Sequence, residues 1–246
     1  MKIIITSKVI AIIGFLFIQT TYAQFQSEGE LSIDKGVIQL ETTFLNQSQG
    51  VGAQKIDYQQ LPYNLLRYGV SNNAEIRLVI NFEGTHKDSG QGLQYKIGSS
   101  QLGAKVAFNK QNDSKTKGAF FSHLIFPKNW NDFSSSFGYS NQFVLKQNIN
   151  SKFSFTSNFG YTHFSNGMRY CNYTTVSILN ISNKFSLFVE PYGVFDSKSN
   201  LVSSIDFGFS YYLVNFQFDF AIGTGINNKM ILQGMVITWR PKKTNK

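Results

Sequence analysis

The two residues best placed for covalent chemistry in this chain are His163 and Ser165, within the run His-Phe-Ser-Asn-Gly at 163–167. A histidine can act as the general base that takes a proton from a serine hydroxyl attacking an ester. Residues two apart on a β-strand lie on the same face, so an extended segment would bring the two side chains together. Aromatic residues occupy most of the preceding odd positions, which places this pair on the apolar face of the strand, near its end.

A second set of candidate functional residues is charged and follows a two-residue period. Between residues 74 and 84, Ile76 and Leu78 alternate with Glu75 and Arg77, so the charged side chains share the polar face. The same reasoning assigns eight charged residues to the polar faces of their strands: Glu41, Arg67, Glu75, Arg77, Lys105, Glu190, Asp206 and Asp219. They could form a structural ladder of ion pairs that fills a narrow barrel, which we favour, or a polar path that selects small solutes.

Residues suited to metal or redox chemistry are scarce. The chain has three histidines and one cysteine, and no carboxylates cluster at the spacing of metal ligands, so we expect no metal site and no cofactor. His86 falls in an expected loop, and His123 in a strand whose facing is ambiguous. Cys171 has no partner for an intramolecular disulfide. Glycines such as Gly98 and Gly208 are expected to ease strand curvature rather than to cradle a phosphate.

The first 23 residues have the three parts of a secretory signal peptide. Lys2 and Lys8 precede the apolar run Val9–Ile18, and a small residue, Ala23, ends the segment, so cleavage is expected after Ala23. The full chain carries a formal net charge of +9, and loss of the two lysines leaves +7. Because the remaining charges are scattered and the chain is exported, we expect no nucleic-acid binding. No later stretch reaches the roughly 18 apolar residues of a membrane-spanning helix.

The most regular pattern runs from Phe185 to Ile222, where large apolar residues alternate with polar or small ones. Such alternation predicts strands with one apolar and one polar face, which suit a soluble sandwich or a membrane barrel. Over the whole chain it predicts about twelve strands: Val37–Asn46, Gln54–Val70, Ala74–Gly84, Gln94–Phe108, Gly118–Phe126, Phe137–Gln147, Phe153–Phe164, Asn172–Ile181, Phe185–Asp196, Leu201–Leu213, Val214–Thr224 and Lys229–Trp239. Most could cross a bilayer, for which about nine to eleven residues are needed.

The connections between the expected strands alternate in length. Tight turns are expected at 71–73, 148–151, 182–184 and near Leu213, and longer links at 47–53, 85–93, 127–136 and 165–171. Membrane barrels have short periplasmic turns and longer external loops, whereas a Greek-key sandwich needs no such regularity. The link at 109–117 is an exception to this alternation, because it is long and charged although a short periplasmic turn is expected there. We therefore predict an all-β protein, a transmembrane antiparallel β-barrel of about twelve strands located in the outer membrane.

This interpretation divides the chain into four parts. Residues 1–23 are the signal peptide, 24–36 an N-terminal periplasmic lead, 37–240 the barrel and 241–246 a basic tail. Barrels of this type often end on an aromatic strand residue, but the nearest one, Trp239, is followed by seven more residues. A single domain is expected, because no linker or change in composition interrupts residues 37–239.

Short motifs along nearly the whole mature chain carry a resemblance to a known family. They are LPYNLLRYGV at 61–70 with NAEIRL at 73–78, IG at 97–98 with GAK at 103–105, FVEPYG at 188–193, DFGFSYYL at 206–213 and FQFD at 216–219. In these motifs the chain resembles the meta-pathway-of-phenol-degradation family of transporter-like outer-membrane barrels. The resemblance implies the same barrel fold and, from the family name, uptake of aromatic compounds by some members.

The run at 163–167 resembles the His-x-Ser-Asn-Gly motif of outer-membrane phospholipase A, which is also a twelve-stranded barrel. In that family the histidine is the general base for the serine, an amide on the neighbouring strand orients the histidine, and calcium helps to stabilise the oxyanion. The resemblance would make His163 and Ser165 the catalytic residues of a calcium-dependent phospholipase. This chain has no matching amide on the next strand to orient His163, because Asn172 lies too close to the loop and residue 177 is a serine.

The sequence therefore favours a barrel without catalysis, which acts as a transporter or narrow channel for a small solute. An aromatic or hydrophobic solute fits the family resemblance. Two alternatives stay open: a phospholipase A-like lipid esterase that uses His163 and Ser165, and a structural or adhesive barrel that transports nothing. The expected partners are outer-membrane lipid and a small-molecule solute, with no nucleic acid, and the oligomeric state is left open.

Overall fold

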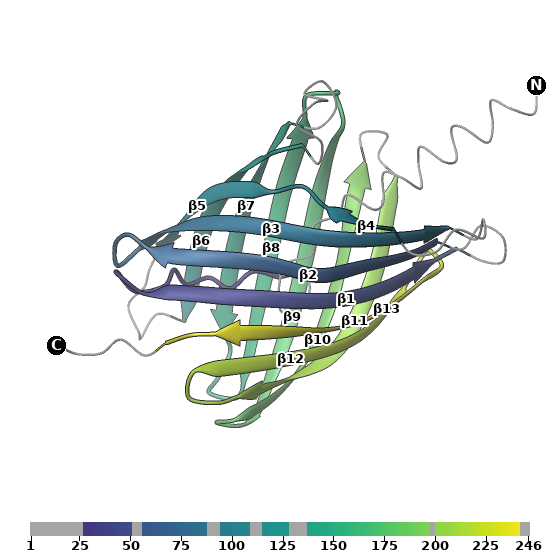
Figure 1. Ribbon diagram of the computed structural model, residues 1–246. Helices are drawn as coiled ribbons and strands as arrows, with labels where there is room; N and C mark the ends of the chain where they lie inside the picture. The colour runs from purple at the N-terminus through teal and green to yellow at the C-terminus, as the bar shows by residue number, and fades with distance from the viewer. Residues whose placement is uncertain are drawn as a thin grey trace, which may run out of the picture.

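The computed structural model describes residues 27–50, 56–87, 94–108, 115–127, 137–196 and 200–241. This part of the chain forms thirteen antiparallel strands and no helix (Figure 1). They are β1 (Ile38–Gln49), β2 (Ile56–Gly69), β3 (Ala74–Lys87), β4 (Gln94–Ile97), β5 (Gln101–Phe108), β6 (Thr116–Ile125), β7 (Gly138–Asn148), β8 (Phe153–Phe164), β9 (Arg169–Ser182), β10 (Phe185–Asp196), β11 (Leu201–Tyr212), β12 (Phe216–Gly225) and β13 (Met230–Trp239). In these residues no helix is long and apolar enough to cross a membrane.

The strands close into a barrel because the first strand pairs with the last. Strand β1 pairs with β13 from Leu40 opposite Trp239 to Gln49 opposite Met230, and the other strands pair with their neighbours in sequence except at β4 and β5. Strands β4 and β5 both pair with β3, at its two ends, and so occupy one position in the wall. Twelve strand positions in a closed antiparallel barrel confirm the predicted fold.

The strand boundaries depart from the prediction by a few residues at several ends, and two differences change the connections. Residues 94–108, expected as one strand, are interrupted between β4 and β5, where the Gly98 amide donates a 2.7 Å hydrogen bond to the Asn81 carbonyl. The link after β8 is shorter than expected, because β9 begins at Arg169. There the Phe164 amide bonds to the Met168 carbonyl at 2.8 Å and Gly167 has a φ of 84°, which together form a four-residue turn.

Alternate residues of each strand point into the barrel and out of it. On β3, Glu75 and Arg77 are both 0% exposed, whereas their neighbour Ile76 is 46% exposed. Large apolar side chains cover the outside in this way on every strand from β1 to β13. Such a continuous apolar surface is unfavourable in water and matches the hydrocarbon of a bilayer. His123, whose facing the sequence left ambiguous, is fully buried on the inside.

The inside of the barrel is filled as well as polar. Apolar residues of β1, β9, β10, β12 and β13 form the largest internal cluster: Leu45, Val176, Ile178, Phe188, Ala221, Met230, Leu232 and Val236. A smaller cluster joins Ala107, Ala119, Phe121 and Val144 on β5 to β7. The lumen therefore has packed apolar regions beside its charged ones, as in other narrow barrels.

Residues 27–36 precede the barrel in sequence, and four of them, Ser27, Glu28, Glu30 and Ser32, are buried against its inner wall. Ser27 and Glu28 are only 2% and 4% exposed. The chain turns from this segment into β1 at Gly36, which has a φ of 78° and donates a 2.8 Å hydrogen bond to the Gly69 carbonyl. The sequence predicted a periplasmic lead at 24–36. The described residues of that stretch fold back along the inner wall, where Glu28 and Glu30 meet the basic residues Arg77, Lys105 and Lys146. We call residues 27–36 the N-terminal segment.

The N-terminal segment depends on the missing side chain of Gly69. A Cβ atom at this position would lie 2.7 Å from the carbonyl carbon of Asp34 and closer still to its oxygen. We predict that Gly69→Val weakens docking of the segment by about 1–3 kcal/mol, the usual cost of overpacking, while the barrel still forms. Faster hydrogen exchange and proteolysis of residues 27–36 would report the loss.

Gly29→Ala is the matched control for this experiment. It lies in the same segment, but a Cβ atom there meets nothing within 4 Å. Its exchange and cleavage rates should equal those of the wild type. Equal rates in Gly69→Val and Gly29→Ala would contradict the prediction.

Candidate functional site

The basic residues of the lumen come together because of the register between β2, β3 and β5. Arg67 lies opposite Arg77 across the β2–β3 pairing, and Glu75 lies opposite Lys105 across the β3–β5 pairing. Like charges directly opposite each other destabilise a sheet, so this part of the wall needs acidic partners. Glu75, one lumen-facing position from Arg77 on the same strand, supplies one of them.

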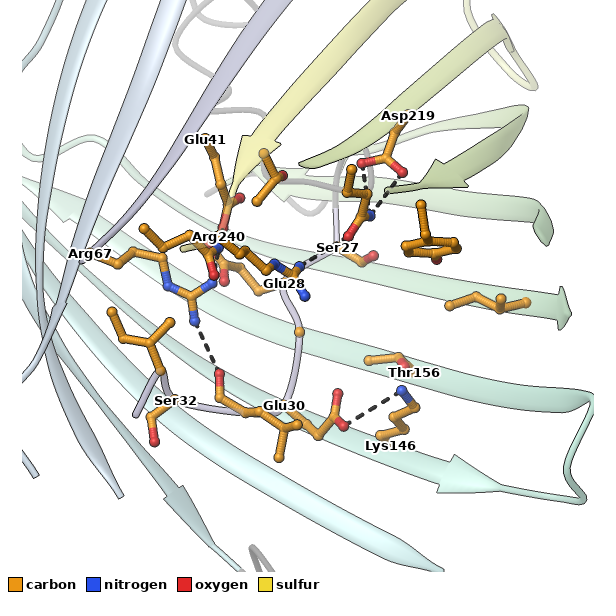
Figure 2. Close-up of a pocket in the computed structure, with 18 of the residues that line it drawn as sticks. Ser27, Glu28, Glu30, Ser32, Glu41, Arg67, Lys146, Thr156, Asp219 and Arg240 are labelled. Carbon is orange, nitrogen blue, oxygen red and sulfur yellow. Dashed lines mark hydrogen bonds and ion pairs between the residues drawn. The ribbon is translucent and has the colours of Figure 1, made fainter. Parts of the chain in front are cut away.

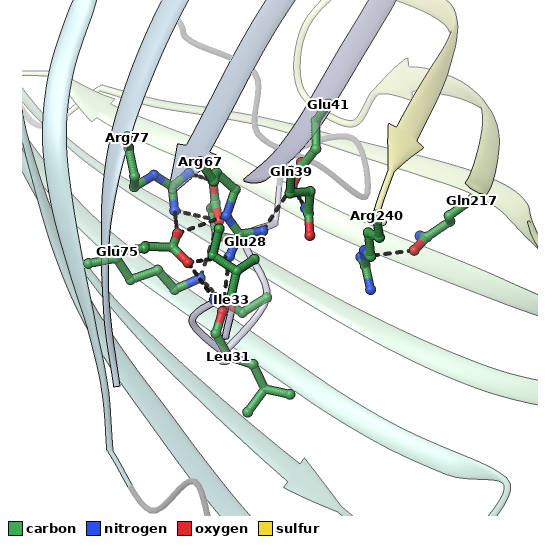
Figure 3. Close-up of polar contacts among 12 residues, drawn as sticks. Glu28, Leu31, Ile33, Gln39, Glu41, Arg67, Glu75, Arg77, Gln217 and Arg240 are labelled. Atoms are coloured by element: carbon green, nitrogen blue, oxygen red, sulfur yellow. Dashed lines mark hydrogen bonds and ion pairs between the residues drawn. The ribbon is translucent and has the colours of Figure 1, made fainter. Parts of the chain in front are cut away.

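Arg67 is neutralised by two carboxylates of the wall. Its Nε and Nη2 donate to the two oxygens of Glu75 at 2.8 and 2.9 Å, and its Nη1 donates to Glu41 at 2.9 Å (Figure 3). The paired contact with Glu75 is the bidentate geometry in which arginine binds carboxylates most strongly. Arg67 Nη2 also donates to the Leu31 carbonyl at 3.0 Å, so the same guanidinium holds the N-terminal segment.

Arg77 and Lys105 are neutralised largely by Glu28 of the N-terminal segment. Arg77 uses both terminal nitrogens, with Nη1 3.1 Å from Glu28 Oε2 and Nη2 bonded to Oε1. Lys105 Nζ lies 3.6 Å from Glu28 Oε2 and also donates to the Gly29 carbonyl. Burial by itself would raise the pKa of Glu28, but the charges of Arg77, Lys105 and Arg67 outweigh it and lower that pKa to about 2.

Weaker contacts fix the rest of the N-terminal segment. The Ile33 amide donates to Glu75 Oε2 at 2.8 Å, and Ser32 Oγ donates to the Asn72 carbonyl at 3.3 Å. Glu30 pairs with Lys146 of β7 across 3.5 Å, on the far side of the segment (Figure 2). The segment is therefore bonded to the wall on two sides of the lumen.

Aromatic rings lie directly beside the basic cluster. Phe121 and His123 on β6 stand opposite Lys105 and Gly103 of β5. The Arg77 guanidinium lies 4.9 Å from the centre of the Phe121 ring, a cation–π contact, and the Phe121 and His123 rings are 5.4 Å apart. Gly103 makes room for the imidazole, since a Cβ atom there would lie 2.8 Å from His123 Nε2.

A cavity of about 740 Å³ separates the N-terminal segment from the opposite wall (Figure 2). Glu28, Glu30 and Arg67 line it on the segment's side, and Thr156, Asp219 and Arg240 on others. Asp219 accepts hydrogen bonds from Gln217 Nε2 at 2.9 and 3.0 Å, and Arg240 donates to Gln217 Oε1 at 3.0 Å. The lining carries both signs of charge and also includes apolar residues such as Val176 and Ile178.

The structure thus separates the eight charged residues that the sequence grouped together. Five of them, Glu41, Arg67, Glu75, Arg77 and Lys105, share the network described above, and Asp219 lines the cavity. Glu190 and Asp206 lie elsewhere, opposite each other on β10 and β11, both 0% exposed and in contact with one another.

His163 faces outward near the end of β8, and Ser165 follows in the turn between β8 and β9. The imidazole packs against the Tyr139 ring at 5.6 Å, and Arg169 is its neighbour on β9. Asn172 lies on the lumen side, where its Cγ would be 2.9 Å from a Cβ atom at Gly160. The structure therefore brings no amide to orient His163 in the described part of the chain.

Four residues of the site were missed by reasoning from the sequence: Glu28, Glu30, Phe121 and His123. The two glutamates stand two residues apart in Ser-Glu-Gly-Glu, at 27–30, a run that contains no apolar residue and gave no strand signal. The sequence did offer one clue to an acidic partner from elsewhere in the chain, because basic residues outnumber acidic ones on the polar faces of β2, β3 and β5. Within the described ranges, no three His, Cys, Asp or Glu residues are grouped as metal ligands would be.

Known structures share the architecture at very low sequence identity. The "CymD monoaromatic hydrocarbon channel" is 8% identical with a TM-score of 0.55, over 87% of this chain and 90% of that one. The "KdgM porin in complex with disordered oligogalacturonate" is 9% identical with a TM-score of 0.54, over 83% and 99%. No curated protein matches the sequence. These similarities concern the fold alone.

A family model gives the more specific result. It matches residues 22–240, nearly the whole chain, and confirms the resemblance seen in the sequence motifs. The protein therefore belongs to the family described as "Putative MetA-pathway of phenol degradation".

Proposed function

We propose that this protein is an outer-membrane barrel that carries a small solute across the membrane, with the N-terminal segment as a plug in its lumen. The observation that supports it best is the combination of an apolar outer surface with a charged lumen in which a segment and a cavity share the space. The apolar outer surface is stable in lipid, and the charged lumen suits water or a polar solute.

The class of solute follows from the relatives and from the lumen. CymD is named as a channel for monoaromatic hydrocarbons, and this chain's own family is named for phenol degradation. Apolar clusters on the inner wall, including Phe188 and Phe121, offer contacts to a ring. A small aromatic or hydrophobic compound is therefore the proposed solute, and outer-membrane lipid the proposed surroundings.

The proposed orientation places the N-terminal segment at the periplasmic end. The segment enters beside the β2–β3 turn at Gly69, and the chain leaves β13 at the same end, where the Arg240 amide bonds to the Asn215 carbonyl at 2.7 Å. The turns at 70–73, 149–152, 183–184 and 213–215 lie at this end and are short, as periplasmic turns are, whereas the link at 109–115 is longer. The proposal includes export by a signal peptide at 1–23, with cleavage after Ala23, and a basic tail at 241–246.

Removal of the plug should open the pore. We predict that deletion of residues 27–33 gives a larger single-channel conductance in planar bilayers than the wild type, because the deletion removes Glu28 and Glu30 and their contacts across the lumen. Liposome swelling with small neutral solutes provides the second measurement. If both proteins stay closed under every condition, the barrel is structural and the transport proposal fails.

Acid should loosen the plug through Glu28. The pKa of this carboxyl is about 2 in the folded protein against an ordinary 4.5, so its stabilising effect is complete above pH 4.5. That effect is lost as the pH falls from about 4.5 through 2, and conductance should rise over this window. Glu28→Gln has no carboxyl to protonate and should lack this component of the pH response. The same rise in both proteins would assign it to other acidic groups.

Lipid hydrolysis is expected to be absent, because His163 contacts Tyr139 rather than an orienting amide. We predict that, with phospholipid vesicles and calcium, the wild type and Ser165→Ala release equal, background amounts of fatty acid. Release that requires Ser165 would establish the esterase alternative instead.

A further inference from the structure

Arg77 and Lys105 are fixed in the barrel wall, but the partner they share belongs to a separate piece of chain. Both side chains are 0% exposed. Glu75 contacts Arg77 Nη1 at 3.3 Å, yet it is already held by two bonds from Arg67. Glu28 is the carboxylate that both Arg77 and Lys105 contact, and it stands 49 residues from Arg77 in sequence.

The contacts of Glu28 are those that a free carboxylate ligand would make. Both of its oxygens face the two terminal nitrogens of Arg77, and Lys105 approaches one of them at 3.6 Å. Bidentate arginine with a second cation is a usual way for proteins to bind carboxylates. When Glu28 is displaced, two buried cations remain, which would attract another anion and repel a cation.

The wall beside these cations suits a flat apolar group. Phe121 lies under the Arg77 guanidinium, and the His123 ring stands beside it over Gly103, tilted by 56°. Ala119 and Val144 extend it with apolar atoms. A ligand with a carboxylate on an aromatic ring could place its charge at Arg77 and Lys105 and its ring along β6.

We propose that Arg77 and Lys105 form a binding site for a small aromatic carboxylate, and that Glu28 of the N-terminal segment occupies this site as an internal mimic. The inference rests on the proposed function for the arrival of the solute through the lumen. It adds a solute class, since a neutral hydrocarbon has no use for two buried cations. It also means that the plug and the solute compete, so each weakens the binding of the other.

The test measures binding of benzoate to the mature, full-length protein in detergent by calorimetry. Benzyl alcohol and benzylamine serve as neutral and cationic probes of similar size. Glu28→Gln should bind benzoate about tenfold more tightly than the wild type. This factor corresponds to one charged hydrogen bond of Glu28 that benzoate no longer has to displace. The affinities for the other two probes should change much less.

Two further variants separate this site from general loosening of the plug. Glu30→Gln removes a negative charge from the same segment, but the partner of Glu30 is Lys146, whose side chain is 24% exposed. This variant should therefore improve benzoate binding far less than Glu28→Gln. Glu28→Gln combined with Lys105→Met should lose the gain. The inference is overturned if Glu28→Gln gains nothing for benzoate, or gains equally for all three probes.

The wild type provides a measurement that needs no variant. Because binding is reciprocal, benzoate should accelerate hydrogen exchange in residues 27–36, and benzylamine should not. An unchanged exchange rate at saturating benzoate would count against competition. Flux into liposomes tests the transport proposal separately. If benzoate binds but does not cross the membrane, the transport proposal is rejected and the binding site is retained. If solutes cross without preference for benzoate, the binding site is rejected and transport is retained.

Discussion

Neutralisation of buried cations is the constraint on which the lumen of this protein depends. Arg67, Arg77 and Lys105 project inward from three neighbouring positions in the wall and are almost entirely shielded from solvent. Leaving one such charge unpaired in the interior costs several kcal/mol, so each needs a carboxylate in good geometry. Glu41 and Glu75 satisfy part of this need, and the remainder draws Glu28 and the N-terminal segment into the barrel.

The wall can support this network because the sheet closes on itself. Pairing of β1 with β13 completes the ring, so the backbone groups of the strands are bonded within the sheet and the apolar outer face can meet lipid. Inside, the alternation of side chains gives every second residue to the lumen. Small residues such as Gly103 let large neighbours such as His123 fill the space, which makes the lumen resemble a packed core more than an open tube.

Function in such a barrel is set by the lumen rather than by the fold. Structures with the same architecture share less than a tenth of their residues with this chain, so the side chains that meet a solute differ. Here Arg67, Arg77 and Lys105 and their aromatic neighbours lie on β2 to β6, whereas Glu190 and Asp206 lie on β10 and β11. A solute would therefore meet different electrostatic surroundings on the two sides of the lumen.

The sequence by itself determined the strands, their inward and outward faces and the family, because these follow from a local period of two and from short motifs. It could also place residues such as Glu75 and Arg77 on the polar face. Only the tertiary structure decided that Glu28 reaches Arg77, that His123 faces inward, that β4 and β5 are separate, and that His163 meets Tyr139. The physical reason is that these contacts join residues far apart in the chain, and strand register and barrel closure, which no local pattern encodes, bring them together.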